Sequence, residues 1–241
     1  MIDSRVFAIE KRGMLLADRV VTVSDLTRNI VINKYGIDPS KVVTVHNAVD
    51  FSGRENLEVQ RGVKEKVVTF LGRITYQKGP EYFIEAAAKV LKRTKNVRFV
   101  MAGSGDMMNR AIRQAARLGI TDRFHFTGFL RGADVQKMFA LSDVYIMPSV
   151  SEPFGISPLE AMRTGVPSII SKQSGAAEVL RYAFKVDFWD VDAMADDIYA
   201  LLHYPALAAF SARQGFDEVN ALKWNGATAK LKAVYESLLN Q

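Results

Sequence analysis

The sequence contains no cysteine, which excludes disulfide bonds and thiolate metal sites and fits a reducing compartment. No apolar run approaches the roughly 18 residues that a membrane span needs. The opening stretch, MIDSRVFAIEKRG, has acidic residues and lacks the apolar segment of a secretory signal. We therefore expect a cytoplasmic protein without disulfide bonds.

The chain has a basic charge balance, with a formal net charge of +6 and a pI near 9.4. Such a balance favours anionic partners, for example nucleic acid, a phospholipid surface or a phosphorylated small molecule. The lysines and arginines are scattered, however, and no basic stripe is interleaved with aromatic residues. This distribution favours a solvated basic surface and predicts no nucleic-acid partner.

From about residue 67 onward, short apolar runs alternate with amphipathic segments. The runs predict strands at 67–71, 97–103, 124–128, 143–148, 166–171 and 183–188, and the segments predict helices at 80–94, 106–119, 132–141, 157–165 and 190–204. This alternation is typical of a doubly wound parallel α/β sheet, a Rossmann-like fold, which we assign to residues 51–210. In such sheets the ligand lies beyond the carboxyl ends of the strands.

The first fifty residues hold two predicted helices (2–16 and 25–35) and two predicted strands (18–24 and 41–47). They are too few to enclose a core alone. They form either the remnant of a preceding domain (residues 1–50) or a pair of strands that the main domain borrows. Residues 211–241 are predicted to be helical.

Two glycine-containing loops follow predicted strands. In GRITYQKG (72–79), Arg73 and Lys78 flank the turn into a helix that starts near Pro80, so its free amides and the two cations could clamp a diphosphate. Ordinary surface residues explain the segment equally well. In AGSGDMM (102–108) a dinucleotide fingerprint would need a third glycine where Met108 stands, which argues against a nicotinamide-dependent dehydrogenase.

The segment EPFGISPLE (152–160) is the most informative. Ser157 to Glu160 reads as a capping box, with proline at the first helical position. Glu152 has no such structural explanation. Between the two glutamates, the amides of residues 154–156 would form an anion cradle, and carboxylates at its margins would need hydroxyl partners. A ligand that places phosphate on these amides and hydroxyls on these carboxylates is a nucleotide-sugar, and the segment therefore predicts a nucleotide-sugar site.

The string Asp190-Val191-Asp192 matches the Asp-x-Asp that holds a metal in one class of glycosyltransferases. It precedes the predicted helix 190–204, so a helix cap with first-turn acids is the preferred interpretation.

The motifs, in their order along the chain, resemble the donor-binding domain of the family 4 glycosyltransferases, which are retaining enzymes of the GT-B fold. The resemblance runs from about Ala17 to the end. It rests on GR-x4-KG (72–79), Gly-x-Gly (103–105), FTGFL (126–130), MPSVSEPFGISPLEAM (147–162), GVPSIIS (165–171) and SGAAEVL (174–180). Segments 17–36 and 45–50 resemble the end of the family's acceptor domain and its linker, and 222–239 resembles its terminal crossing helix.

The resemblance implies a catalytic set of Glu152, Arg73 and Lys78, in which the two cations neutralise the diphosphate and the glutamate holds donor-sugar hydroxyls. It implies that Glu160 binds the ribose. The remaining donor-binding residues that it implies are Gly72, Gly103, Gly105, Phe129, Leu130, Phe154, Gly155 and Ile156, with Phe129 and Leu130 beside the base. It implies no metal and no cofactor beyond the nucleotide-diphosphate sugar, whose base stays open among uracil, adenine and guanine.

The chain departs from the family pattern at Asn47-Ala48 and Gly175-Ala176, where Asn-Gly and Gly-Gly are usual. It also lacks most of the acceptor domain and that domain's catalytic histidine, which His46, His125 and His203 do not match. We therefore expect this chain to bind donor but to transfer sugar slowly or not at all. The acceptor, a carbohydrate or lipid, and peripheral membrane association of the full-length protein stay open. The alternatives are a GT-B sugar-nucleotide epimerase and a non-catalytic basic binding module.

Overall fold

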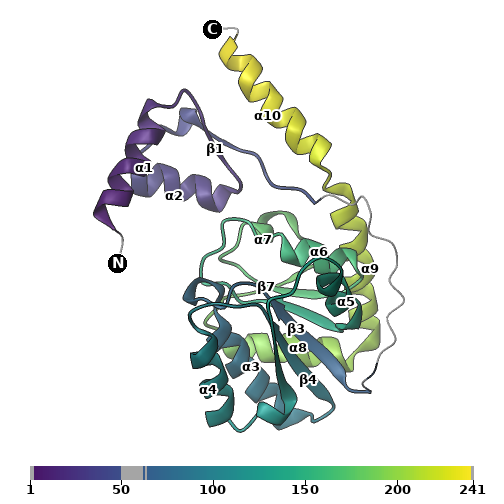
Figure 1. Ribbon diagram of the computed structural model, residues 1–241. Helices are drawn as coiled ribbons and strands as arrows, with labels where there is room; N and C mark the ends of the chain where they lie inside the picture. The colour runs from purple at the N-terminus through teal and green to yellow at the C-terminus, as the bar shows by residue number, and fades with distance from the viewer. Residues whose placement is uncertain (1–2, 50–61, 63, 240–241) are drawn as a thin grey trace. The chain divides into compact units, whose positions relative to one another are not determined.

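The computed structural model describes residues 3–49, 62 and 64–239, and the chain divides into two compact units (Figure 1). The larger unit comprises Phe51–Ala221, and the smaller comprises Met1–Asp50 together with Leu222–Gln241. The predicted boundary at residues 50 and 51 lies outside the described residues. Among the described helices, none combines the length and the hydropathy of a membrane span.

The larger unit is built on a six-stranded sheet in which every neighbouring pair is parallel. The strand order is β5-β4-β3-β6-β7-β8. The bounds are β3 (Lys66–Leu71), β4 (Val97–Ala102), β5 (Phe124–Gly128), β6 (Val144–Met147), β7 (Ser168–Ser171) and β8 (Phe184–Val186). The order reverses between β3 and β6, so the crevice at their carboxyl ends is where a ligand of a doubly wound sheet binds. The predicted fold class is confirmed.

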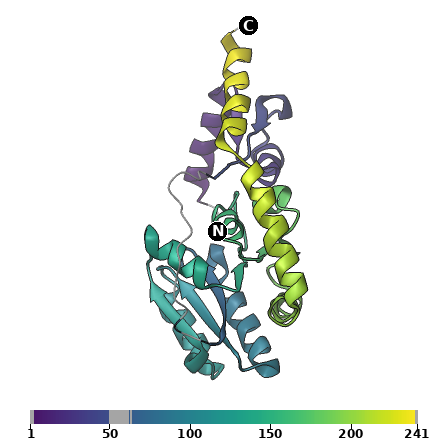
Figure 2. The same cartoon turned by 90° about the vertical axis from the view of Figure 1, so that its right-hand side faces the viewer.

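Helices cover both faces of this sheet, since right-handed crossovers send α3 and α4 to one face and α5 and α6 to the other. α8 packs on α3, and α9 packs on α6 (Figures 1 and 2). The bounds are α3 (Pro80–Arg93), α4 (Met108–Arg117), α5 (Ala133–Leu141), α6 (Ser157–Arg163), α7 (Ala176–Val179), α8 (Val191–His203) and α9 (Pro205–Ala221), with short turns η2 (Tyr76–Lys78) and η3 (Thr121–Arg123). Pro80 begins α3, as the sequence predicts.

The core lies between the sheet and α3, where aromatic rings pack together. Phe83 of α3 lies 5.8 Å from Phe70, 5.9 Å from Phe99 and 5.4 Å from Phe124, measured between ring centroids. All four side chains are buried. Strands covered on both faces need apolar residues at most successive positions, which is why they appear as nearly continuous apolar runs in the sequence.

The larger unit extends to Ala221, beyond the predicted end at residue 210. The reason is that α9 is one continuous helix packed closely on α6. A Cβ added to Gly215 would lie 2.6 Å from the Met162 Cε atom. Glu218 also accepts hydrogen bonds from the Arg181 and Tyr182 amides, at 2.9 and 3.2 Å.

The smaller unit contains a second, two-stranded parallel sheet. Its elements are α1 (Ser4–Leu16), β1 (Val20–Thr22), α2 (Asp25–Tyr35), η1 (Pro39–Lys41), β2 (Val42–Thr44) and α10 (Trp224–Leu239). Val31, Ile37 and Val42 form its small core. The two strands pair with each other, so the idea that the main domain borrows them is wrong.

Asp197 on α8 should make the stability of the larger unit depend on pH. Burial, followed by the charges of Asp196 and Asp190, raises the pKa of Asp197 to about 6, from an ordinary value of 3.8. The folded state thus holds this proton more tightly than the unfolded state, and the free energy of unfolding falls as the pH rises from about 4 to 6. Asp197→Asn should therefore raise the melting temperature at pH 7.5 and have little effect at pH 4.

Thermal unfolding of both proteins between pH 4 and 8 measures this difference. Asp217→Asn, at an exposed position of α9, is the matched control. Equal changes in melting temperature for the two variants would contradict the prediction. So would an increase for Asp197→Asn that does not change with pH.

Candidate functional site

Three loops at the carboxyl edge of the sheet are joined by main-chain hydrogen bonds. The Val150 amide donates to the Gln77 carbonyl at 2.9 Å, which ties the β6–α6 loop to the β3–α3 loop. The Glu152 amide donates to the Gln173 carbonyl, and the Gly175 amide donates to the Glu152 carbonyl, both at 3.0 Å. The β7–α7 loop is therefore joined to the same structure, and the three loops form one rigid frame at the crevice.

The predicted Gly-x-Gly turn brings a fourth loop, the β4–α4 loop, into backbone contact with the β3–α3 loop. A Cβ on Gly103 would lie 1.8 Å from the Gly72 carbonyl oxygen, and a Cβ on Gly105 would lie 2.2 Å from the Ile74 carbonyl oxygen. The Ile74 amide donates to the Ser104 carbonyl at 2.8 Å. No side chain fits at either glycine, so this turn exists to let the loops after β3 and β4 pack directly on each other.

Lys78 and Glu152 form an ion pair at the centre of the frame. Lys78 Nζ donates to Glu152 Oε2. The two side chains are only 18% and 10% exposed. The lysine stem runs past Gly72, where an added Cβ would lie 3.8 Å from Lys78 Cδ. Arg73, by contrast, is exposed, and its Nη2 lies 3.4 Å from Gln77 Oε1. The structure thus brings together two predicted site residues whose pairing the sequence did not predict.

The loop that precedes α6 turns at Gly155, which has φ +94°. A Cβ there would lie 2.9 Å from Met147 Cε and 3.1 Å from Glu152 Cγ. The amides of Gly155 and Ile156 donate to no acceptor within the described part of the chain. The Phe154 side chain is buried at 2% exposure, so this ring belongs to the core.

The predicted capping box at Ser157 is wrong. α6 begins at Ser157 itself, its N-cap is Ile156 in helical conformation, and no side chain among the described residues caps it. Ser157 Oγ instead accepts a hydrogen bond from the Tyr145 hydroxyl at 2.7 Å. Tyr145 is fully buried, and burial raises the pKa of its hydroxyl, with smaller contributions from the charges of Glu152 and Glu160. A buried tyrosine hydroxyl needs a partner, and this requirement sets the direction of Ser157.

A cavity of about 700 Å³ opens at this edge of the larger unit. Six of the predicted site residues line it: Gly72, Arg73, Gly103, Phe129, Leu130 and Glu160. The other predicted residues are not part of its lining: Lys78, Gly105, Glu152, Phe154, Gly155 and Ile156. The cavity nevertheless adjoins the ion pair, because Lys78 lies along Gly72.

Much of the cavity wall consists of residues that the sequence does not predict as site residues. Gln136 and Phe139 come from α5, Arg163 is the last residue of α6, Thr164 is that helix's C-cap, and Phe216 comes from α9. Arg163 lies three residues after Glu160 on one helix, a spacing that predicts a shared face. Phe216 is far away in sequence, and no local signal connects it to the site. At the rim, the Arg131 guanidinium lies 5.1 Å from the Phe129 ring centroid, and Phe129 is 63% exposed.

The other candidate motifs have structural roles. Asp190 caps α8, since its side chain accepts from the Ala193 amide at 3.0 Å, and Asp192 pairs with Lys89. The interpretation of the Asp-x-Asp string as a helix cap is confirmed. His203 Nδ1 lies 2.9 Å from the Tyr199 carbonyl oxygen, and its ring stacks on the Tyr199 ring. His125 is exposed on β5.

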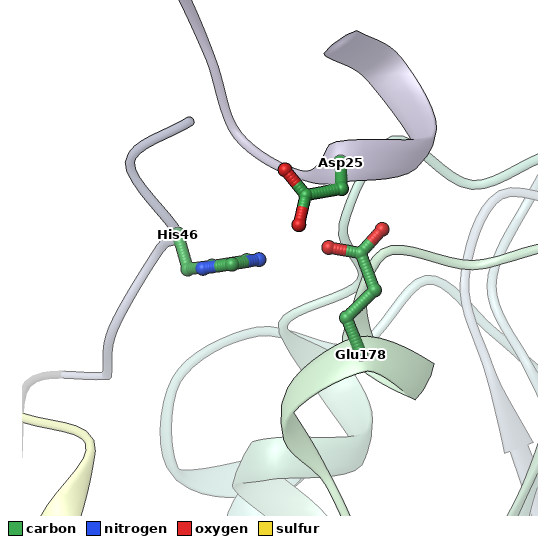
Figure 3. Close-up of side chains that lie close together, drawn as sticks. All are labelled: Asp25, His46 and Glu178. Carbon is green, nitrogen blue, oxygen red and sulfur yellow. The ribbon is translucent and has the colours of Figure 1, made fainter. Parts of the chain in front are cut away.

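Figure 3 shows Asp25 and His46 of the smaller unit. Asp25 is the first residue of α2, and its Oδ1 accepts a hydrogen bond from Thr44 Oγ1 at 2.6 Å. His46 follows β2. The third labelled residue, Glu178, lies on α7 of the larger unit. Asp25 therefore links the start of α2 to the end of β2 within its own unit.

Comparison with known proteins agrees with this architecture. Residues 54–216 match the family described as glycosyl transferases group 1, and residues 1–52 match glycosyltransferase family 4. An uncharacterized glycosyltransferase of Methanocaldococcus jannaschii is 34% identical over 192 residues, which cover 75% of this chain and 49% of the relative. D-inositol 3-phosphate glycosyltransferase of Segniliparus rotundus is 27% identical over 243 residues, 94% of this chain and 54% of the relative.

The chain thus spans about half the length of the curated relatives it matches. Among solved structures, Anabaena HepE in complex with UDP and glucose superposes with a TM-score of 0.86 at 20% identity, covering 100% of this chain and 68% of that chain. This likeness shows the fold. The chain therefore belongs to the group 1 glycosyl transferases, as a family 4 glycosyltransferase of the GT-B fold.

Proposed function

We propose that the larger unit binds the donor of a retaining glycosyltransferase, a nucleoside-diphosphate sugar. The observation that carries the proposal is the Lys78–Glu152 pair, held in a rigid loop frame against a cavity of about 700 Å³. Small-molecule sites are commonly about 300–1,000 Å³ in volume and combine apolar walls with a few fixed polar groups. Of the alternatives, neither the epimerase nor the basic binding module is favoured by any feature of this site.

The geometry supports a division of labour across the site. The diphosphate would be bound by Arg73, by Lys78 and by the amides of Gly155 and Ile156, which have no acceptor among the described residues. Cations and free backbone amides both attract phosphate oxygens. Glu152 would accept hydrogen bonds from the donor sugar. Neutralisation by arginine and lysine would serve in place of a divalent metal.

The nucleoside would occupy the cavity itself. Glu160 lies on its wall and would accept hydrogen bonds from the ribose hydroxyls, while Phe129 and Leu130 at the rim would lie beside the base. The HepE structure contains UDP and glucose, which supports UDP as the first nucleotide to test. Sugar departure and acceptor attack would occur on one face of the ring, so the anomeric configuration is retained. The acceptor would be a carbohydrate or lipid hydroxyl.

Because the chain spans about half the length of its curated relatives, we propose that it binds donor but transfers sugar slowly or not at all. Calorimetric titration with UDP, GDP and ADP, with and without magnesium, tests donor binding. We expect saturable binding of one nucleotide in preference to the others, and no requirement for magnesium. No binding of any nucleotide, or rapid transfer by this chain, would contradict the proposal.

Glu160→Gln should weaken UDP binding about 10- to 100-fold, because hydrogen bonds to a charged group contribute about 1.5–3 kcal/mol. Inorganic diphosphate, which has no ribose, should bind equally well to wild type and variant. Asp134→Asn is the matched control, since Asp134 lies on α5 but does not line the cavity. Equal weakening of UDP and inorganic diphosphate would show that Glu160 acts on the fold or on the phosphates instead.

A further inference from the structure

The Lys78–Glu152 ion pair occupies the position from which Lys78 would contact a diphosphate. The lysine is the cation that the ligand needs, yet its charge is already neutralised by Glu152. Both side chains are largely shielded from water, so a charge separated from its partner here is costly. Donor binding must therefore exchange one partner of Lys78 for another, an inference that rests on the proposed function.

The two partners differ in their freedom to move. The Glu152 main chain is held by hydrogen bonds with Gln173 and Gly175, each 3.0 Å long. Its side chain lies against Gly155, where an added Cβ would be 3.1 Å from Glu152 Cγ. Lys78 has a flexible four-carbon stem that passes Gly72 with ordinary van der Waals room. Of the two side chains, Lys78 is therefore the one with room to turn toward a bound diphosphate.

Glu152 then needs a new partner. The Arg73 side chain points to Gln77, with Nη2 3.4 Å from Gln77 Oε1, and is exposed. Hydroxyl groups of a donor sugar can donate to Glu152, whereas a nucleoside diphosphate without its sugar offers no donor there.

We propose that the Lys78–Glu152 pair discriminates between the intact nucleotide-sugar and the spent nucleoside diphosphate. The sugar hydroxyls replace Lys78 as partners of Glu152, which offsets the loss of the ion pair. The nucleoside diphosphate binds Lys78 but offers no hydroxyl to Glu152, which stays buried without a partner. The pair therefore weakens binding of the product and promotes its release.

The test is Glu152→Gln, which keeps the shape of the side chain and removes its charge. Calorimetry with UDP and UDP-glucose, and with GDP and GDP-mannose, measures the ratio of the two dissociation constants for each pair. Because Lys78 no longer has to leave an ion pair, we expect the variant to bind the nucleoside diphosphate about three- to tenfold more tightly than wild type. The affinity for the nucleotide-sugar should not increase, so the preference for the nucleotide-sugar over the nucleoside diphosphate disappears.

Glu160→Gln is a control with the opposite expected effect, since it should weaken UDP binding, whereas Glu152→Gln should strengthen it. The double variant Lys78→Met/Glu152→Gln carries neither charge and should bind UDP more tightly than Lys78→Met alone. It also replaces the single variant if Glu152→Gln does not fold. Absence of nucleotide binding by wild type would overturn the proposed function. UDP binding by wild type that is unchanged or weaker in Glu152→Gln would overturn this inference alone.

Discussion

Replacing Gly103 with alanine is expected to abolish nucleotide binding and to lower the free energy of unfolding by about 2–5 kcal/mol. The new Cβ would lie 1.8 Å from the Gly72 carbonyl oxygen, at φ +147°. The loop cannot move away cheaply, because the Gly103 amide donates to the Gly128 carbonyl at 2.8 Å. Relief of the clash would displace Gly72 and with it Lys78. Chemical unfolding and calorimetry with UDP measure the two effects.

Gly119→Ala is the matched control. Gly119 also has a positive φ, +67°, but an added Cβ would meet no atom of the described residues within 4 Å. The Gly119→Ala substitution should lower the free energy of unfolding only by the strain of the left-handed conformation, about 1–2 kcal/mol. It should leave nucleotide binding unchanged. If the two variants lost stability equally, or if Gly103→Ala still bound UDP normally, the close packing of these loops would not support the site.

Lys78→Ala is expected to weaken UDP binding about 10- to 100-fold, since a charge-assisted hydrogen bond contributes about 1.5–3 kcal/mol. The variant loses the phosphate contact and also leaves Glu152 without its cation. The remaining carboxylate repels the incoming diphosphate. Calorimetric titration with UDP and with inorganic diphosphate should show a similar loss for both ligands, because the lysine acts on phosphate and not on the nucleoside.

Lys172→Ala is the control for general electrostatics. Lys172 follows β7 at the same edge of the sheet and pairs with Asp187 at 2.9 Å. Its removal changes the net charge equally but should affect UDP binding little. Unchanged affinity in Lys78→Ala would remove Lys78 from the site, and equal losses in both variants would reduce its role to non-specific attraction.

The order and type of the elements could be predicted because their signals are local. Strands buried on both faces require nearly continuous apolar runs, and these mark β3 and β6. Pro80 begins α3, and Asp190 caps α8, because both effects act within a single helical turn. Alternating strands and helices then restrict the topology to a parallel sheet with its ligand at the carboxyl edge.

The partners of individual side chains depended on contacts that local signals do not encode. Lys78 meets Glu152 across 74 residues because β3 and β6 are neighbours in the sheet. Ser157 accepts a hydrogen bond from Tyr145 and does not cap its own helix, because the fully buried tyrosine hydroxyl requires a partner. Phe216 reaches the cavity wall only because α9 packs on α6. Periodicity and caps arise within a few residues, whereas the site arises where distant segments meet.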